Sequence, residues 1–263
     1  MSPVRWLWRA PHRWFIAVAV AIPLGCAIDT QLSLTEAQQW LLAAVVWFVV
    51  LSVLPLLPRD RQMMLLCFLP LITIAELLLS HDLGWYVYRL DNIPPWIIPA
   101  HGVVFLTAMR AVDTTAISTR ALAWGAGGAQ ALYGLLSLLL RGDEVGALLS
   151  VVYVIGMIVL PDDGKRFYAA IGLVVAYLEI IGSALGVWTW TPELFGLTET
   201  NPLSGAVGGY AMVDGAAYVV ATYGVARILA ARPMRAEGLE PPRPEPPAPK
   251  AGASTNSATP ARG

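Results

Sequence analysis

The segment 75-AELLLSHDLGWYVYRLDNIPPWIIPAH-101 runs from an acid in a hydrophobic run, through an aromatic and proline-rich connection, to a histidine that opens the next hydrophobic run. A second segment, 179-EIIGSALGVWTWTPELFGLTETNPLSGAVGGYAMVD-214, has the same plan. The matching residues are Glu76, Gly84, Trp85, Tyr86 and Tyr88 in the first segment and Glu179, Gly186, Trp188 and Trp190 in the second. We interpret this pattern as a duplicated helix–loop–helix unit with one acid in each copy.

The composition is that of a membrane protein. Of 263 residues, 57% are hydrophobic and only 13% are charged, which is too apolar for a soluble domain. The net charge is -1 and no basic patch is present, which argues against nucleic-acid binding. The basic and then apolar N-terminus is interpreted as an uncleaved first span, because no clear cleavage site follows it.

A helix needs about 20 mostly apolar residues to cross a bilayer. Candidate spans lie at about residues 14–30, 37–57, 62–81, 97–112, 117–140, 145–160, 167–190 and 205–229, and the first, fourth and sixth of them are short. We therefore expect an all-α, polytopic membrane helix bundle of about eight transmembrane helices, arranged as two parallel four-helix repeats. The bundle would occupy residues 1–231, with halves at about 14–112 and 117–231. The proline-rich remainder, 232–263, should be a disordered cytoplasmic tail.

The distribution of basic residues predicts the orientation. When the connections are assigned alternately to two sides, only Arg89 and Arg141 fall on one side. Positive residues favour the cytoplasmic side, so both termini of this multi-pass protein should be cytoplasmic, in the cell (plasma) membrane. Repeats offset by four spans keep the same orientation. Both aromatic connections should then face the outside.

Four ionisable residues are candidate catalytic groups: Glu76, Glu179, His101 and Asp214. Ionisable residues within spans are costly and usually functional, and these four can meet in the outer half of the bundle. A carboxylic acid that keeps its proton is a ready general acid, and two neighbouring ones can divide the roles of acid and base. The alternative is structural: each glutamate could cap a helix or accept a hydrogen bond from a nearby Trp or Tyr.

Candidate substrate-binding residues are mainly aromatic: Trp85, Tyr86, Tyr88, Trp188, Trp190, Asn201 and Tyr210. An interfacial aromatic belt would account for most of them. They could also line a polyene or prenyl chain, whose cationic intermediates are stabilised over ring faces.

No pattern in the sequence predicts a metal or a cofactor. A site formed by His101 with Glu76, His81 and Asp82 was considered, but HxxxH and HExxH spacings are absent. His101 is better explained as a proton carrier or orienting donor. Walker, Rossmann, serine-elbow and zinc signatures are also absent.

The order Glu, Gly, aromatic-x-aromatic, proline-rich turn and polar-capped helix resembles the carotenoid hydratase family. The resemblance covers Glu76 to about His101 and, more loosely, Glu179 to Trp190. Proteins of that family are multi-pass and add water across a terminal double bond of an acyclic carotenoid. The resemblance implies that Glu76 donates the proton and that His101 or Asp214 handles water. The family pattern places its glycine and aromatics nearer a single acid, whereas both halves carry one here. The remainder is similar to uncharacterised bacterial integral membrane proteins.

These patterns favour a membrane enzyme that acts by acid–base chemistry on a lipid-soluble isoprenoid or carotenoid-like substrate. The reaction would be hydration, isomerisation or cyclisation, in a pocket open to the outer leaflet. Its partners would be that lipid-soluble molecule and membrane lipid; the oligomeric state is not indicated. One alternative is a small-solute or lipid transporter, since repeats and mid-membrane acids also occur there. Another is a non-catalytic membrane assembly protein.

Overall fold

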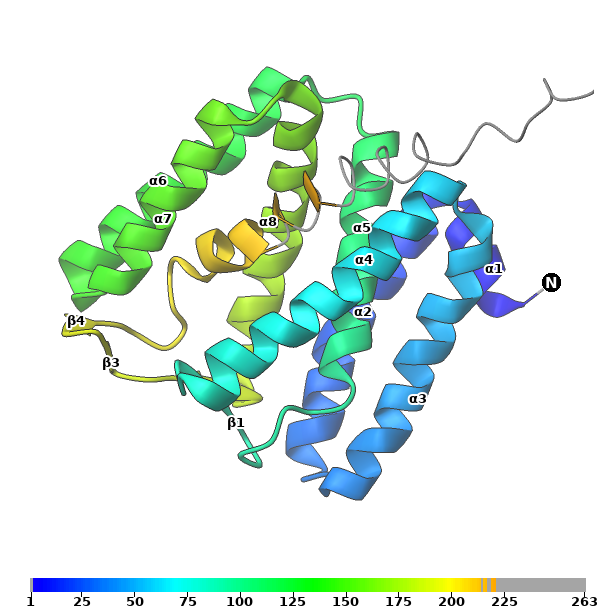
Figure 1. The fold of residues 1–263 in the computed structure, drawn as a ribbon, viewed down its shortest axis with the longest axis horizontal. Coiled ribbons are helices and arrows are strands. Elements are labelled where there is room, and N and C mark those ends of the chain that lie inside the picture. The colour runs from blue at the N-terminus through cyan, green and yellow to red at the C-terminus, as the bar shows by residue number, and fades with distance from the viewer. Residues whose placement is uncertain (1, 214, 217–218, 221–263) are drawn as a thin grey trace, which may run out of the picture.

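The protein is a bundle of tilted helices in the computed structural model, which describes residues 2–213, 215–216 and 219–220 (Figure 1). The helices are α1 (Pro3–Arg9), α2 (Pro11–Gln31), α3 (Glu36–Val53), α4 (Arg59–Glu76), α5 (Ile97–Thr114), α6 (Thr119–Arg141), α7 (Glu144–Val159) and α8 (Asp162–Ala184). A 3-10 turn, η1 (Leu54–Leu56), extends α3, and a π-helix, η2 (Leu77–Asp82), extends α4. Another helical segment covers 206–213. The expectation of a mostly helical fold is confirmed. Asp214 and the tail at 232–263 lie outside the described residues.

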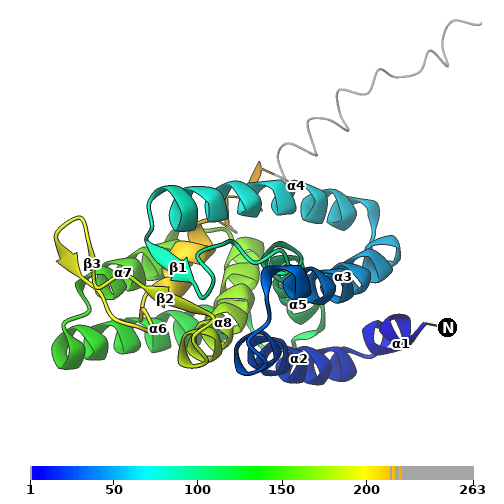
Figure 2. The same ribbon diagram turned by 90° about the horizontal axis from the view of Figure 1, so that it is seen from below.

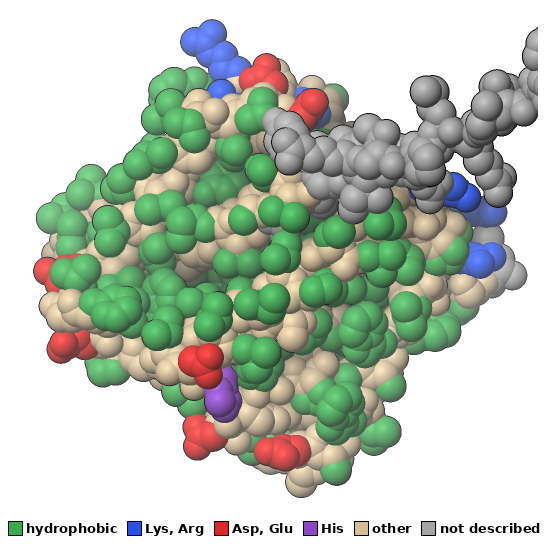
Figure 3. All heavy atoms as spheres, viewed as in Figure 1, with side chains coloured by type: hydrophobic (Ala, Val, Ile, Leu, Met, Phe, Trp, Pro, Cys, Tyr) green, Lys and Arg blue, Asp and Glu red, His purple; other side chains and the backbone are tan. Residues whose placement is uncertain are grey.

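Five helices in the described part of the chain are long and apolar enough to cross a membrane. They are α2, α3 with η1, α4 with η2, α6 and α8. Large apolar side chains such as Leu140, Trp124 and Val159 are exposed on the outside of the bundle, as expected for a lipid-facing surface. The face in Figure 3 is largely hydrophobic, and its Lys and Arg side chains lie along the upper and right-hand edges. These features indicate a membrane protein. Helices α5 and α7 do not meet these criteria of length and hydrophobicity. In the described part of the chain, five of the eight expected spans therefore correspond to helices that do.

The seventh expected span, 167–190, has different bounds in the structure. Helix α8 begins at Asp162 and ends at Ala184. Gly186 follows in the left-handed region (φ 71°), which is a common way for a helix to end. The alternating aromatic sequence after it is extended rather than helical. Glu179 therefore lies near the end of its helix and not, as expected, near the middle.

Short strands join the two aromatic connections, which the all-α prediction did not include. Strand β1 (Tyr86–Tyr88) pairs antiparallel with β2 (Trp188–Trp190) in the register Tyr86↔Trp190, Val87↔Thr189 and Tyr88↔Trp188. Successive side chains of a strand point to opposite faces, so the four aromatic rings are buried while Val87 and Thr189 are exposed. Figure 2 shows these strands beneath the helices. A second small pair, β3 (Glu193–Leu194) and β4 (Leu197–Thr198), follows.

The hydrogen bonds that flank the β1–β2 pair are equivalent on the two sides. The amide of Arg89 donates to the carbonyl of Val187 (3.0 Å), and the amide of Thr191 donates to the carbonyl of Trp85 (3.1 Å). Each strand is preceded by a glycine in the left-handed region, Gly84 and Gly186. The two connections thus enter the pair with the same backbone geometry.

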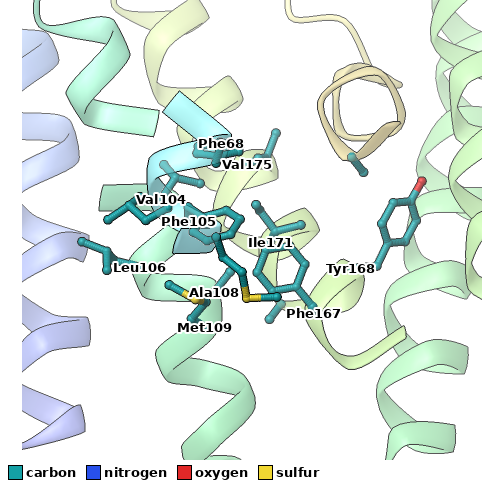
Figure 4. Packing of buried hydrophobic residues seen from close by; sticks show 14 of the residues in the cluster. Phe68, Val104, Phe105, Leu106, Ala108, Met109, Phe167, Tyr168, Ile171 and Val175 are labelled. Carbon is teal, nitrogen blue, oxygen red and sulfur yellow. The ribbon is translucent and has the colours of Figure 1, made fainter. Parts of the chain in front are cut away.

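Helix α5 lies at the centre of the bundle. Its Phe105 stacks on Phe68 of α4, with ring centroids 4.5 Å apart, and meets Phe167 of α8 edge-on at 5.1 Å. Figure 4 shows these rings among buried aliphatic side chains. Because the core joins α4, α5 and α8, it fixes the relative positions of the helices that carry Glu76, His101 and Glu179.

Candidate functional site

Glu76 is the last residue of α4, and its side chain is only 1% exposed. Its Oε2 accepts hydrogen bonds from the hydroxyls of Tyr86 (2.9 Å) and Tyr88 (2.8 Å). Both tyrosines point inward because they are two residues apart on β1. The acid of the first half is therefore held by the strand that follows it in the chain.

His101, in the second turn of α5, meets the other oxygen of the same carboxylate. Its Nε2 lies 3.0 Å from Oε1 of Glu76, and the residue is 5% exposed. On its other side, the imidazole ring faces Tyr210, with ring centroids 5.6 Å apart. The structure thus brings together two of the residues predicted to be catalytic.

The hydrogen-bond pattern indicates where a proton can move. Oε2 of Glu76 already accepts two phenolic hydrogens, so it is a poor position for the acidic proton. Among the described residues, the hydrogen-bond partner of Oε1 is Nε2 of His101, which can either donate to it or accept from it. One proton between Oε1 and Nε2 therefore satisfies both groups. This geometry allows a proton to pass between the two side chains.

Burial is the main cause that raises the pKa of the Tyr86 and Tyr88 phenols well above the ordinary value. Tyr210 and Glu76 raise the pKa of Tyr86 further, and Glu76, Tyr86 and Tyr210 raise that of Tyr88. The shift favours the protonated hydroxyls that donate to Glu76 and orient its carboxyl group.

A small cavity of about 20 Å³, room for about one water molecule, adjoins this unit. We call it the Glu76 hollow. It is lined by Ile72, Ala75, Glu76, Leu79, Trp85, Tyr86, Leu149, Trp190, Ala206, Gly209, Tyr210 and Val213. Glu76, Tyr86 and Tyr210 place carboxyl and hydroxyl groups in an otherwise apolar and aromatic wall.

Glycines in 206–213 bring that segment against α7 and so form one side of the hollow. A Cβ atom on Gly208 would collide with the backbone carbonyl of Leu149, so a larger residue could not occupy this position. Small residues allow this kind of close helix approach in membranes. The run GAVGGY therefore has a packing role that places Tyr210 beside His101.

Glu179 has a different set of partners. Its Oε1 accepts hydrogen bonds from Oγ of Ser183 (2.6 Å) and from Nε1 of Trp190 (2.6 Å). Nε1 of Trp188 lies 3.2 Å from its Oε2. The side chain is 3% exposed. Both indoles of β2 thus hold this acid, as both phenols of β1 hold Glu76.

A second, smaller cavity of about 10 Å³ adjoins Glu179. We call it the Glu179 hollow. It is lined by His101, Val175, Leu178, Glu179, Trp188 and Tyr210. Tyr210 borders both hollows. Three of the four predicted catalytic residues therefore lie around two adjacent spaces, and Asp214 falls outside the described residues.

The residues around the two hollows occupy matching positions in the two aromatic segments of the sequence. Val175, Leu178 and Glu179 of α8 correspond to Ile72, Ala75 and Glu76 of α4 at constant spacing. Trp188 likewise takes the place of Tyr86, at the start of the paired strand. His101 and Tyr210 also correspond, because each follows by four residues a turn bond that begins its helix, Ile97 to Pro94 and Ala206 to Leu203.

The predicted substrate-binding residues divide into three groups. Trp85, Tyr86, Trp190 and Tyr210 line the Glu76 hollow, and Trp188 with Tyr210 lines the Glu179 hollow. Tyr88 contacts Glu76 but lines neither space. Asn201 lines neither; its Oδ1 lies 3.4 Å from the amide of Trp190, which indicates a structural contact.

Sequence reasoning missed Glu199. This loop residue is 6% exposed, and its carboxylate accepts hydrogen bonds from Nε1 of Trp85 and from Oγ1 of Thr191, both at 2.8 Å. Burial raises the pKa of Glu199 above its usual 4.5, although these two donors oppose the shift. An acid in a connecting loop gives no sequence signal, because loop acids are normally exposed.

Asp29 was also missed. It is fully buried near the end of α2 and accepts hydrogen bonds from Gln39 (3.0 Å) and from Arg89 (2.9 Å). Arg89 donates in addition to the carbonyl of Leu34. This network fastens the β1 connection to the α2–α3 turn and does not touch either hollow.

Among the residues that the structure describes, no three His, Cys, Asp or Glu side chains gather closely enough to hold a metal ion. Comparisons with known protein families, with curated proteins and with solved structures found no match to this chain. The site must therefore be interpreted from its own chemistry.

Proposed function

We propose that this chain is an integral membrane enzyme that transfers a proton to and from a lipid-soluble isoprenoid or carotenoid-like molecule at the Glu76–His101 pair. The observation that carries the proposal is the arrangement of Glu76. One carboxylate oxygen is saturated by two phenols, and the other shares a proton position with His101 in the wall of an apolar hollow.

The chemistry follows from that arrangement. The shared proton is added to one carbon of a double bond, and the C=C electron pair forms the new C–H bond. The other carbon becomes a carbocation. Attack by water gives an alcohol, loss of a neighbouring proton gives an isomer, and attack by a second double bond gives a ring. In each outcome a proton returns to the Glu76–His101 pair, so the pair is regenerated.

Aromatic rings around the Glu76 hollow support a cationic intermediate. Trp85 and Trp190 are T-shaped to each other at 5.6 Å, and Tyr86 is 4.9 Å from Trp190. All three line the hollow. A cation over such ring faces is stabilised by about 0.5–2 kcal/mol, and more when water is excluded.

The proposed architecture is eight spans in two parallel halves, with both termini cytoplasmic and the β1–β2 pair outside. The equivalent bonds across this pair support a duplicated unit. The path from Glu76 to Gly84 is one residue longer than the path from Glu179 to Gly186, and π-helix η2 lies within the longer path. A π-turn accommodates an extra residue in a helix without moving the elements on either side.

The position of the polar groups favours an enzyme over a transporter. Glu76 ends α4, and Glu179 lies in the last two turns of α8, so both acids sit at the end of the bundle next to the strand pair. A transporter needs groups that can be reached alternately from both sides. The resemblance to carotenoid hydratases agrees with this choice and suggests an acyclic carotenoid as the first substrate to test.

The test is product formation in cells that accumulate an acyclic carotenoid. The full chain is expressed there, and extracted lipids are compared by liquid chromatography and mass spectrometry. We expect a product that is heavier by one water or has the same mass and a changed absorption spectrum. Glu76→Gln should lower its amount by about 100-fold or more, the usual scale for loss of acid–base catalysis.

Glu76→Gln is informative because glutamine keeps the size and can still bond to both tyrosines and to His101. The matched control is Glu36→Gln at the exposed start of α3. Full product formation by Glu76→Gln would refute the proposed mechanism. Absence of any product from the unaltered protein would refute the carotenoid-like substrate class.

A further inference from the structure

We infer that the β3–β4 hairpin is a lipid anchor, whose tip lies in the bilayer surface on the side of the β1–β2 pair. The partner is membrane lipid, at the boundary between the head groups and the acyl chains. The tip consists of Leu194, Phe195, Gly196 and Leu197, and we call these four residues the hairpin tip. The inference requires a membrane protein but does not depend on the proposed enzymatic activity.

The first argument is the exposure of the hairpin tip. Phe195 is 85% exposed, the highest value of any large apolar side chain that the structure describes. Leu197 of β4 is 38% exposed. In water such a ring leaves a large apolar surface hydrated, whereas at the bilayer boundary that surface is removed from water. Phenylalanine and leucine are among the side chains that interfacial membrane-binding segments bury at this boundary.

The second argument is the backbone of the hairpin tip. Leu194 pairs with Leu197, so Phe195 and Gly196 are the two central residues of the turn, and both have positive φ, 53° and 83°. Tight turns of this kind favour asparagine or aspartate at the first central position and glycine at the second, because a bulky side chain is disfavoured in the left-handed region. The formation of the turn therefore does not explain an aromatic residue at position 195, and a contact outside the chain does.

The third argument is the position of the hairpin at the end of a membrane-crossing helix. Helix α6 is long and apolar enough to span the bilayer, and its Leu139 and Leu140 are 70% and 78% exposed just before the helix ends at Arg141. The change from exposed leucines to an arginine marks the bilayer surface. The hydroxyl of Thr198 in β4 donates to the carbonyl of Gly142, the residue that follows α6. The hairpin is thus fastened at the depth of the bilayer surface.

Hydrogen bonds at the base of the hairpin hold the tip in one place. The amide of Glu199 donates to the carbonyl of Pro192 (3.1 Å), and Oγ1 of Thr191 donates to Oε1 of Glu199 (2.8 Å). The amide of Thr198 donates to Oε2 of Glu144 at the start of α7 (2.9 Å). Figures 1 and 2 both show the β3–β4 pair at the edge of the molecule, next to the ends of α6 and α7. The tip is therefore held at the periphery of the bundle, where lipid surrounds the helices.

The charges around the hairpin indicate which kind of lipid contact is used. Residues 191–204 include Glu193 and Glu199 but no Lys or Arg. Attraction to anionic head groups requires basic residues, so the contact of the hairpin tip is apolar. Phosphatidylcholine, which has no net charge, should therefore be sufficient for binding.

The experiment uses a phosphatidylcholine that carries a diazirine on its acyl chain, close to the glycerol. The purified full chain is placed in phosphatidylcholine nanodiscs that contain this probe and is irradiated, and the labelled residues are identified by mass spectrometry. The variants are Phe195→Asp, which replaces the ring by a charge, and Phe195→Leu, which keeps an apolar side chain. Thr189→Asp is the matched control, because it adds the same charge at an exposed position of the neighbouring β1–β2 pair.

In the unaltered protein the probe should label the hairpin tip and the exposed leucines at the end of α6. Phe195→Asp should lower the labelling of the tip at least about tenfold, the scale expected when a large apolar side chain loses its burial. Phe195→Leu and Thr189→Asp should keep the labelling of the tip. Labelling of Leu139 and Leu140 should be the same in every variant, which shows that each variant is folded and inserted in the membrane.

Labelling of Leu139 and Leu140 without labelling of the tip in the unaltered protein would overturn the anchor. A tip covered by a second copy of the chain would give this result, and the nanodiscs would then contain two chains. Undiminished labelling of the tip in Phe195→Asp would also overturn the role of the ring. Failure to label α6 as well would contradict the placement of this helix end at the bilayer surface. Because labelling requires no turnover, none of these results depends on whether a carotenoid product is formed.

Discussion

At the residue scale, the carboxylate of Glu76 has one donor, Tyr88, that does not line either hollow. Tyr88 is 3% exposed, lines neither hollow and donates to Oε2 at 2.8 Å. Its hydroxyl therefore serves orientation and stability. Removing it leaves the apolar contacts of the ring in place, so the effect of the single hydrogen bond can be isolated.

We expect Tyr88→Phe to lower the free energy of unfolding by about 1.5–3 kcal/mol, the usual range for a hydrogen bond to a charged group. Thermal unfolding in detergent measures this change. Tyr133→Phe, at a 37% exposed position on α6, is the control and should be nearly neutral. Equal stability of the two variants would show that Tyr88 is not a significant donor to Glu76.

Glu199 makes the outer connection sensitive to pH. Because burial raises its pKa above 4.5, the folded state binds the proton more tightly than the unfolded state does. The contribution of Glu199 to stability is then fully present below pH 4.5 and is lost as the pH rises through its folded pKa. Glu199→Gln should remove this contribution, so its melting temperature should fall less than that of the unaltered protein as the pH rises above 4.5. Parallel melting curves for the two proteins across that range would contradict the assignment.

At the element scale, η2 provides the clearest difference between the halves. Leu78 lies in η2 and Ile180 lies in the regular helix α8, and the two are 50% and 52% exposed. Deleting one residue from a π-helix can restore regular helix, whereas deletion from a regular helix rotates everything that follows. Only the second deletion should separate an acid from its strand.

We therefore expect deletion of Leu78 to leave a folded protein and deletion of Ile180 to abolish folding. Protein yield and thermal unfolding in detergent test this expectation. Leu78 and Ile180 serve as a matched pair because they are similar in size and in exposure. If both deletions are equally harmful, the π-helix η2 does not accommodate an extra residue.

The sequence was informative about those secondary-structure elements that are determined by the local periodicity of hydrophobic residues. The order from Glu76 to Tyr86 and Tyr88 singled out an acid followed by alternating aromatics, but it was interpreted as a loop and the strand was not predicted. It could not indicate that β1 pairs with β2, since that pairing joins distant parts of the chain. The end of α8 was placed too late because the apolar run continues past Gly186. The burial of Asp29 and Glu199 depends on Arg89, Gln39 and Trp85 and was invisible for the same reason.

At the scale of the whole molecule, cysteine labelling distinguishes the two ends of the bundle. The exposed Thr189 is on the β1–β2 pair, and the exposed Asp60 is at the start of α4. With Cys26 and Cys67 replaced by serine, single cysteines at these two positions report on the two sides. Serine is small enough for both sites, although Cys26 is buried.

A membrane-impermeant maleimide should label Thr189→Cys in intact cells and Asp60→Cys only after permeabilisation. This outcome follows from the basic residues near α4 and the positive-inside rule. Labelling of both positions in intact cells, or the reverse pattern, would contradict the proposed orientation.

The β1–β2 pair has one further consequence. Its inward rings donate to the two acids that lie beneath it, so the strands cannot lift away without removing two donors from each carboxylate and leaving only His101 beside Glu76 and Ser183 beside Glu179. The strand pair is thus tied to the helix bundle by side-chain bonds as well as by the chain connections. Under the proposed function, a product would leave sideways into the lipid and not past the strands.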